Sequence, residues 1–300
     1  MKKLRIAVIG YGNVGRFTVE AINASEDMEL AGVVRRTKSL KNTPLELSNT
    51  KVVSNIDDLG KVDVAIICGP SRSVPELAPV YLSKGIYTVD CFDIHTDIYD
   101  LHEKLDGIAK KNKVASVTAA GWDPGSDSVV RTLMMAMAPK GLTYTNFGPG
   151  MSMGHSVVAR SKKGVKNALS MTIPCGAGIH SRMVYVELAK GYTAEKIYDE
   201  LKADSYFAHD ELHVIPVNSI DECKDMGHGV LMERKGVSGM TQSQRFKFEM
   251  TINNPALTGQ IMVACARAIV KQKPGCYVMP EIPPMDYLPG TKEQLIRSLI

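Results

Sequence analysis

Leu4–Ile9 runs directly into Gly10-Tyr11-Gly12-Asn13-Val14-Gly15, and this stretch decides the fold of the first part of the chain. An apolar strand that breaks into a G-x-G-x-x-G turn and a helix is typical of a dinucleotide-binding βαβ unit. Gly10 suits the tight turn, Gly12 lets the backbone approach the pyrophosphate, and Gly15 lets the helix pack closely on the strand. The N–H groups at the start of the helix would face the phosphates. We expect cofactor contacts from Gly10, Tyr11, Gly12, Asn13, Val14 and Gly15.

A second apolar run, Met28–Val34, ends in Arg35-Arg36-Thr37, where an NAD-binding protein would carry an acidic residue. A carboxylate there accepts from the ribose 2′-OH and repels a 2′-phosphate, whereas guanidinium groups bind phosphate in bidentate fashion. Arg35, Arg36 and Thr37 therefore favour NADP over NAD as the cofactor. The alternative is that two exposed arginines simply end a strand.

The composition is that of an ordinary globular protein: 300 residues, 44% hydrophobic, 23% charged, with a formal net charge of +4. This length suggests two domains. The basic residues are dispersed, so nucleic acid is not an expected partner, and no apolar run approaches the roughly 20 residues of a membrane span. The first strand starts at Leu4, which leaves no room for a signal peptide. Six widely spaced cysteines without a C-x-x-C predict no metal or disulfide framework and favour a reduced, cytoplasmic protein.

Strand-like and helix-like segments alternate through the first part of the chain. We expect strands at Leu4–Ile9, Met28–Val34, Lys51–Val53, Val62–Cys68, Tyr87–Asp90 and Val114–Thr118, and helices at Val14–Ala24, Ser73–Lys84 and Tyr99–Lys111. Such alternation with near-continuous apolar strands predicts a parallel sheet covered on both faces. Ligands of these sheets lie beyond the carboxyl ends of the strands. That rule selects Cys68-Gly69-Pro70-Ser71 for the cofactor, and Asp90–Asp93 and Ala120–Asp123 for further chemistry.

The pattern changes around Gly121–Gly125, after which a helix capped by Ser126 or Asp127 is expected to run to Met137. Strand-like alternation follows at Leu142–Phe147, Ala168–Ile173, Met183–Glu187, Glu211–Pro216 and Phe246–Ile252, with one helix near Ala194–Lys202. A last long helix, Ala256–Lys271, is expected to return to the nucleotide domain. The predicted class is α/β, with a doubly wound Rossmann sheet and a second α+β domain of mostly antiparallel sheet. Residues 1–121, completed by 255–300, form the first domain, and 122–254 form a substrate-binding and dimerisation domain.

Two acidic segments follow predicted strands of the first domain. Asp90 and Asp93 could bind a substrate ammonium or take its proton, or Asp93 could simply cap the helix that follows. Asp123 lies beside Trp122, the only tryptophan, in a turn bracketed by glycine and proline. That turn is either one wall of a ligand cleft or a hinge packed by an aromatic ring.

The second domain contains four further candidates for substrate binding. Phe147–His155 is a glycine-rich loop whose N–H groups could cradle a carboxylate, or a plain connector. Thr172 and Arg182 lie on neighbouring strand-like runs and could together hold a carboxylate, unless Arg182 forms an ordinary salt bridge. His228 is freed from steric neighbours within Met226-Gly227-His228-Gly229-Val230, although a lone histidine is more often structural. Asn254, before the last helix, would ordinarily be a cap.

Together these segments resemble the meso-diaminopimelate dehydrogenase family, in its shorter length type, over nearly the whole chain. The resemblance is carried by Gly10–Gly15 with Arg35-Arg36, Val89–Asp93, Ala120–Asp127, Thr143–His155, Met171–Pro174, Met226–Gly229 and Asn254-Pro255. It implies reversible NADP-dependent deamination of the D-configured centre of meso-2,6-diaminopimelate to L-2-amino-6-oxopimelate, ammonia and NADPH. It also implies a homodimer or a higher homo-oligomer.

The resemblance implies a role for each candidate residue. The reacting D end of the substrate would meet Asp93, Trp122, Asp123, Met153 and Gly154; the L end would meet Thr172, Arg182, His228 and Asn254, with Phe147 between them. Asp93 is the expected base, directly or through a water, and Asp123 is the second carboxyl expected to take part in catalysis. No metal is required. A substrate bound with its D and L ends exchanged would leave buried charges unpaired, and this cost is the expected origin of selectivity for the D centre.

Three alternatives remain open at this point. One is another NADP-dependent oxidoreductase of the same plan, such as a dihydrodipicolinate reductase or homoserine dehydrogenase; the former should show a His-rich catalytic stretch with a nearby lysine. The second is a broad D-amino-acid dehydrogenase that acts on simpler 2-oxo acids. The third is a non-catalytic NADPH sensor, although Asp93, Asp123 and Arg182 would be costly in a cleft with no charged ligand.

Overall fold

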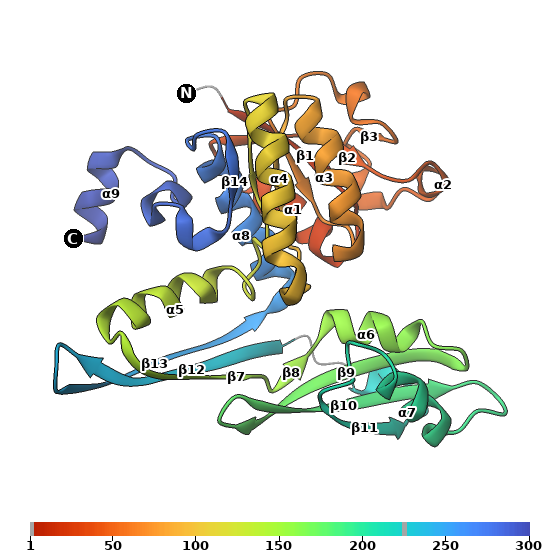
Figure 1. Cartoon of the computed structure of the whole chain (residues 1–300). Helices are drawn as coiled ribbons and strands as arrows, with labels where there is room; N and C mark the ends of the chain where they lie inside the picture. Colours follow the sequence, from red (N-terminus) through yellow and green to blue (C-terminus); the bar gives the residue numbers. More distant parts are fainter. Residues whose placement is uncertain (1–2, 224–226) are drawn as a thin grey trace. The chain divides into compact units, whose positions relative to one another are not determined.

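The structure is a computed structural model that describes residues 3–223 and 227–300 (Figure 1). The chain forms two compact units, Met1–Thr132 with Pro255–Ile300, and Leu133–Asn254. The first division thus falls inside helix α5 (Ser126–Met137), whereas the sequence placed it before Trp122. The reason is that the residues after 121 are bonded to the first unit: the Ser126 N–H donates to the Gly121 carbonyl at 3.1 Å, and Val129 of α5 packs against the core that contains Ile6 of the sheet.

A seven-stranded sheet forms the centre of the first unit, in the order β14-β6-β5-β4-β1-β2-β3. Its strands are β1 (Leu4–Ile9), β2 (Met28–Val34), β3 (Val52–Val53), β4 (Val64–Ile67), β5 (Tyr87–Asp90), β6 (Ala115–Val117) and β14 (Gly275–Tyr277). Every neighbouring pair is parallel. The predicted parallel sheet is confirmed. The sequence missed only β14, which is too short to show a pattern and extends the sheet beside β6.

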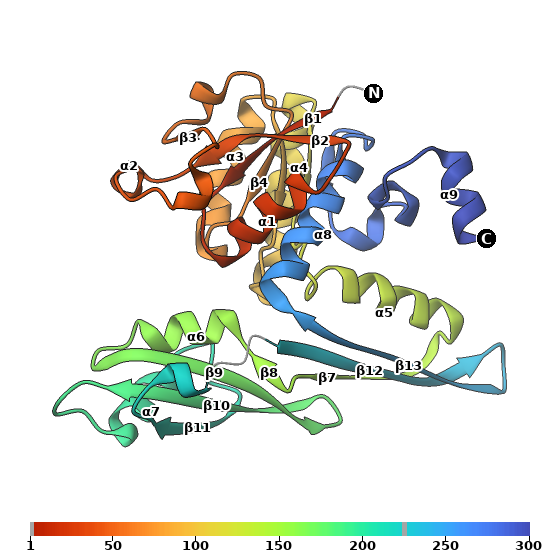
Figure 2. The ribbon, with the colours of Figure 1, turned by 180° about the vertical axis from the view of Figure 1, so that it is seen from behind.

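Helices cover both faces of this sheet (Figures 1 and 2). Helices α1 (Asn13–Asn23) and α8 (Asn254–Ile269) lie against one face, and α3 (Val74–Ser83) and α4 (Ile98–Asn112) lie against the other. The unit also contains α2 (Thr37–Leu40), α9 (Lys292–Leu299) and the first part of α5. Ile6 and Val8 of β1 pack in one core with α1 and α8, while Ala7 and Ile9 pack in a second core with α3 and α4. Because successive strand residues point to opposite faces, this division confirms the doubly wound arrangement and the return of the last long helix.

The second unit contains two smaller sheets, ordered β11-β10-β9-β8 and β13-β12-β7. The strands are β7 (Lys140–Phe147), β8 (Gly150–Met151), β9 (Val165–Gly176), β10 (Ile179–Leu188), β11 (Glu211–Pro216), β12 (Gly227–Ser238) and β13 (Gln242–Asn253), with helices α6 (Met153–Arg160) and α7 (Ala194–Lys202). All pairs are antiparallel except β10 with β11, which α7 connects by a crossover. The prediction of a mostly antiparallel α+β unit is confirmed.

One prediction about local structure in the second unit is wrong, and one strand was missed. The glycine-rich run Phe147–His155 is no simple loop, because it contains strand β8 and the first turn of α6. His228 lies on β12, a strand that was not predicted and that pairs with β13 on one side and β7 on the other. Glycines beside His228 hid this strand, since glycine weakens any strand pattern. Met226, the first residue of that motif, lies outside the described residues.

Candidate functional site

The glycine turn of the first unit has the geometry that a dinucleotide requires. Gly10 adopts φ +96°, a conformation that favours glycine. A side chain on Gly15 would approach the Gly10 carbonyl oxygen to 2.3 Å, so α1 can pack against β1 only with glycine there. A Cβ on Gly12 would meet nothing within 4 Å, and the N-terminus of α1 has no side-chain cap. Open space and uncapped N–H groups at this end of α1 fit a pyrophosphate.

The arginines after β2 are available for an anion. Arg35 directly follows β2, where its backbone N–H donates to the Val53 carbonyl and its Nη1 donates to the Asn42 carbonyl at 3.1 Å. Arg36 and Thr37 are exposed at the start of the short helix α2. Within the described residues neither arginine forms an ion pair. Their two positive charges at the end of β2 therefore fit a ribose 2′-phosphate.

Asp93 lies at the end of the neighbouring strands β4 and β5. Its Oδ1 accepts a hydrogen bond from the Ser71 hydroxyl at 2.6 Å, and the backbone N–H of Asp93 donates to the Ser71 hydroxyl oxygen at 3.3 Å. Asp93 is exposed, and it does not cap α4, which begins after Asp97. The structure thus brings the predicted base next to the loop Cys68-Gly69-Pro70-Ser71 that was predicted to contact the cofactor.

Asp90 has a structural role, contrary to the predicted contact with substrate. Its side chain is fully buried. Its Oδ1 accepts from the N–H of Phe92 at 3.0 Å, the hydroxyl of Thr118 at 3.0 Å and the N–H of Ala119 at 3.3 Å, while Oδ2 has no partner. Burial raises the pKa of this carboxyl to about 6. Asp90 therefore ties the end of β5 to the end of β6 from inside the unit.

Asp123 is the carboxyl most strongly perturbed by its surroundings. Trp122 beside it is buried, and burial raises the pKa of Asp123 to about 8, with further contributions from the charge and hydrogen bond of Asp127. Asp93 contributes to the same rise, so the two predicted catalytic carboxyls act on one another. His95 Nε2 lies 4.0 Å from Asp123 Oδ2. A carboxyl with this pKa holds a proton at neutral pH, so it can serve as an acid or, after losing it, as a base. Asp127 and His95 were not selected from the sequence.

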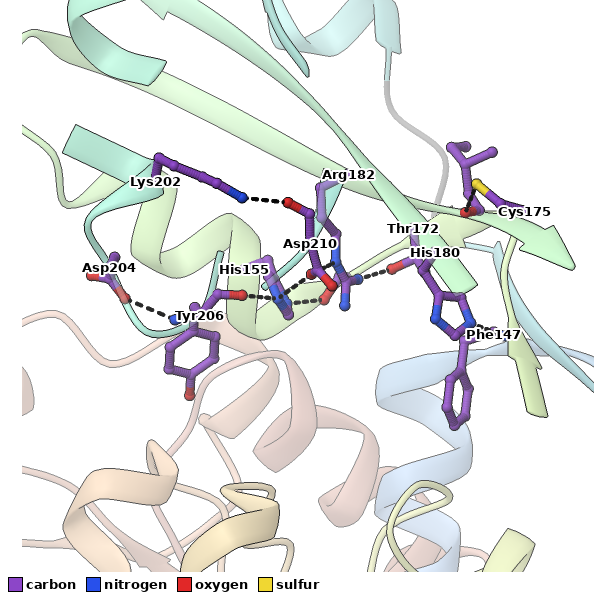
Figure 3. Close-up of polar contacts among 12 residues, drawn as sticks. Phe147, His155, Thr172, Cys175, His180, Arg182, Lys202, Asp204, Tyr206 and Asp210 are labelled. Carbon is purple, nitrogen blue, oxygen red and sulfur yellow. Dashed lines mark hydrogen bonds and ion pairs between the residues drawn. The ribbon is translucent and has the colours of Figure 1, made fainter. Parts of the chain in front are cut away.

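Arg182 is held by two partners in the second unit (Figure 3). It lies on β10 directly opposite Thr172 on β9, and its Nη1 donates to the Thr172 hydroxyl. Its Nε donates to Asp210 Oδ2 at 2.5 Å. Thr172 and Arg182 thus lie side by side on neighbouring strands, as expected, and the ion pair with Asp210 is the salt bridge that the alternative anticipated. Binding of a carboxylate by the two residues stays a prediction. Asp210 was missed, since no motif surrounds it; the only signal in the sequence is its position immediately before the predicted strand Glu211–Pro216.

His155 packs against the segment that carries Asp210. Its Nδ1 lies 2.9 Å from the Ser152 hydroxyl and its Nε2 lies 2.8 Å from the Tyr206 carbonyl oxygen. Because a carbonyl can only accept, Nε2 carries the proton and Ser152 donates to Nδ1. Burial, followed by the charge of Arg182, lowers the pKa of His155 to about 4. The imidazole is therefore neutral at pH 7. The ion pair beside it is formed by Arg182 and Asp210.

The remaining predicted residues of the second unit lie on strands and helices. The Phe147 N–H donates to His180 Nε2 at 2.8 Å, and the two rings lie 5.5 Å apart. Met153 and Gly154 form the first turn of α6, so they do not belong to a loop. His228 is buried on β12, where its Nδ1 accepts from the Gly229 N–H at 2.8 Å. Asn254, the last residue of this unit, begins α8.

The two units thus offer different chemistry. The first combines a dinucleotide-binding turn with two interacting carboxyls, which can bind an ammonium and transfer a proton. The second carries a guanidinium beside a hydroxyl, which suits a carboxylate. Within residues 3–223 and 227–300 no group of three or more His, Cys, Asp or Glu residues is arranged to hold a metal ion. In the same ranges, no helix combines the length and apolarity needed to cross a bilayer.

Comparison with known proteins gives consistent matches along the chain. Residues 121–180 match the family described as "Diaminopimelic acid dehydrogenase C-terminal domain", and residues 4–92 match "Oxidoreductase family, NAD-binding Rossmann fold". The chain is 57% identical to a meso-diaminopimelate D-dehydrogenase of Bacteroides fragilis over 300 residues, which covers both chains completely. It is 32% identical to the enzyme of that name from Acetivibrio thermocellus, covering 100% of this chain and 98% of that one.

Two solved structures share the whole fold. The DAP dehydrogenase of C. glutamicum in complex with DAP superimposes with a TM-score of 0.90 at 26% identity, covering 100% of both chains. An engineered D-amino acid dehydrogenase bound to NADP+ has a TM-score of 0.87 at 25% identity, again with complete coverage.

Proposed function

This chain belongs to the meso-diaminopimelate D-dehydrogenase family, and we propose that it catalyses the reversible oxidative deamination of meso-2,6-diaminopimelate at its D centre. The products are L-2-amino-6-oxopimelate and ammonia, and the cofactor is NADP. The observation that carries this proposal is the presence of two chemically opposite sets of anchors. Carboxyls lie beside the nucleotide turn in the first unit, and an oriented guanidinium lies in the second.

The substrate explains why two sets of anchors are useful. Each end of meso-diaminopimelate carries an ammonium and a carboxylate, and the ends differ only in configuration. In this proposal Asp93 and Asp123, with Trp122, Met153 and Gly154, receive the D end. Thr172 and Arg182, with His228 and Asn254, receive the L end, and Phe147 lines the space between. A molecule bound in reverse would leave charges without partners, which costs more than a lost apolar contact.

In the proposed reaction the side chains of this protein bind the substrate and transfer protons. The D-centre ammonium must lose a proton before its carbon can release a hydride, and Asp93 accepts that proton directly or through a water. NADP, when bound, supplies the hydride acceptor. Asp123 then exchanges its proton with the water that adds to the resulting imine, since a pKa of about 8 suits both directions of transfer. Hydrolysis of the imine releases ammonia and the 2-oxo acid.

Preference for NADP is supported by the unpaired charges at the end of β2. Arg35 and Arg36 form no ion pair with the described residues, and Thr37 adds a hydroxyl beside them. A 2′-phosphate would neutralise both guanidinium groups, whereas the 2′-OH of NAD offers them no negative charge. We expect these residues to set the choice of cofactor.

Assembly and location also belong to the proposal. We expect a homodimer or higher homo-oligomer that covers exposed apolar side chains of α5 and β7, namely Leu133, Met135, Met137, Leu142 and Tyr144. Light scattering coupled to size exclusion would measure the mass in solution. All six cysteines are free, which suits the reducing cytoplasm.

Parallel assays on the three stereoisomers test the proposed function. The purified protein is given meso-, LL- or DD-diaminopimelate with either NADP+ or NAD+, and absorbance of the reduced cofactor is followed. We expect turnover of the meso isomer with NADP+, none of the LL isomer, and a much lower kcat/KM for the DD isomer, whose far end has the wrong configuration. No reduction of NADP+ with the meso isomer would refute the proposal. Equal rates with D-leucine would favour a broad D-amino-acid dehydrogenase instead.

A further inference from the structure

The guanidinium of Arg182 is fixed on one side and open on another. Nε donates to Asp210 Oδ2 at 2.5 Å and Nη1 donates to the Thr172 hydroxyl, whereas Nη2 has no hydrogen-bond acceptor within residues 3–223 and 227–300 (Figure 3). Only 15% of the Arg182 side chain is exposed. An arginine held through Nε and one Nη keeps its plane fixed and still offers N–H groups to a carboxylate.

Asp210 is itself held by the protein. Its carbonyl accepts from Lys202 Nζ at 2.7 Å, and its N–H donates to the Phe207 carbonyl at 3.3 Å. Phe207 is fully buried and meets the ring of His155 edge-on at 5.0 Å. Asp210 also directly precedes β11, whose residue Leu212 pairs with Arg182. The carboxylate is therefore placed by the backbone and by packing, independently of the arginine that it contacts.

We propose that Asp210 is a positioning residue that orients the Arg182 guanidinium for the carboxylate at the far end of the substrate, and that it thereby contributes to specificity for substrates charged at both ends. This inference rests on the proposed function. An unoriented arginine would lose side-chain freedom on binding, which costs affinity. Asp210 removes that cost in advance, and its negative charge keeps the partly buried guanidinium compensated before substrate arrives.

Screening of the Arg182 charge by Asp210 would have the opposite effect on substrate binding, and kinetics of two variants separate screening from orientation. A carboxylate 2.5 Å from Nε lowers the net positive charge that an incoming carboxylate meets. If this screening dominated, removing the charge would tighten binding. If orientation dominates, Asp210→Asn, whose amide oxygen can still accept from Nε, binds substrate better than Asp210→Ala but worse than the wild type. The order of the two variants therefore decides between the effects.

Steady-state kinetics with meso-diaminopimelate test the inference. We expect Asp210→Ala to raise KM for meso-diaminopimelate by about 10- to 100-fold, the usual effect of losing a hydrogen bond to a charged group, with kcat changed by less than about threefold. Asp210→Asn should raise KM by a smaller factor. KM for NADP+ should stay unchanged in both. Glu233→Ala is the matched control, because Glu233 also accepts from an arginine in this unit and is 24% exposed against 25% for Asp210.

A second measurement needs no turnover. In ¹H–¹⁵N spectra of arginine Nε–H groups, assigned by comparison with Arg182→Lys, the Arg182 signal should be present in the wild type without substrate and lost in Asp210→Ala. A lower KM in Asp210→Asn, an unchanged KM in Asp210→Ala, or equal effects in Glu233→Ala would overturn the inference. Inactivity of the wild type on meso-diaminopimelate would instead reject the proposed function, while the spectra would still report whether Asp210 holds Arg182.

Discussion

Replacing Arg35 and Arg36 by alanine probes the origin of cofactor choice. Both side chains follow β2, neither is in an ion pair with the described residues, and Arg36 is exposed. At a solvent-exposed site each contact between an arginine and a 2′-phosphate contributes roughly 0.5–1 kcal/mol, because water weakens ion pairs. The two together are worth about 1–2 kcal/mol, which corresponds to a change in kcat/KM for NADP+ of about 5- to 30-fold. The same variant should keep its kcat/KM for NAD+, because NAD+ has no 2′-phosphate.

The assay is initial-rate kinetics with saturating meso-diaminopimelate and varied NADP+ or NAD+, on the wild type, the two single variants and the double variant. The melting temperature serves as control, since among the described residues the Arg35 side chain loses only one hydrogen bond, the one to the Asn42 carbonyl at 3.1 Å. Equal losses of kcat/KM for both cofactors would refute the reasoning, because they would indicate damage to the turn at Gly10–Gly15. A loss confined to NAD+ would reverse the assignment.

Three further predictions concern the first unit. Asp93→Asn should lower kcat by more than about 100-fold and leave the Kd for NADPH unchanged by fluorescence titration, because the proton acceptor is lost but the cofactor contacts remain; a variant with normal kcat would remove Asp93 from the mechanism. Asp123 has a pKa raised from 3.8 to about 8 in the folded chain, so the folded state binds a proton that the unfolded state has released, and stability falls as pH rises from about 4 to 8. Asp123→Asn should flatten this fall in urea denaturation at pH 5 and pH 8, and an equally steep fall in the variant would contradict the shift. Gly15→Ala, whose Cβ would lie 2.3 Å from the Gly10 carbonyl oxygen, should lower the free energy of unfolding by more than about 2 kcal/mol, whereas Gly12→Ala, with open space, should change it little; similar losses in both would disprove the packing argument.

The predictions from the sequence agree best with the structure where a local element depends only on neighbouring residues. Gly10, Gly12 and Gly15 act within one turn, and the alternation of strand and helix in the first unit depends on the residues of each element alone. Strands β1, β2 and β5 have the predicted bounds, and α7 begins and ends as predicted. The opposite case is β12, where Gly227 and Gly229 around His228 carry no strand signal. That strand forms because β13 and β7 supply hydrogen bonds on both sides.

The candidate site divides in the same way. A carboxylate after β5 and an arginine on a strand of the second unit could be picked from the sequence, since residue type and position at a strand end suggest their chemistry. Their surroundings could not. Asp90 and Asp93 are three residues apart with similar sequence context, yet one is fully buried and the other exposed. The difference arises because Thr118 and Ala119, directly after β6, donate hydrogen bonds to the buried carboxylate of Asp90.

By itself, the sequence determined the nucleotide-binding turn, the doubly wound class, the positive charges after β2 and the residue types that handle ammonium and carboxylate groups. Only the tertiary structure decided which carboxyl holds a proton and which acid meets Arg182. Asp210 lies 28 residues from Arg182 along the chain and reaches it because β11 pairs with β10. The physical reason is that glycine geometry and side-chain periodicity act between neighbours, whereas burial and pairing energies depend on segments that only folding brings together.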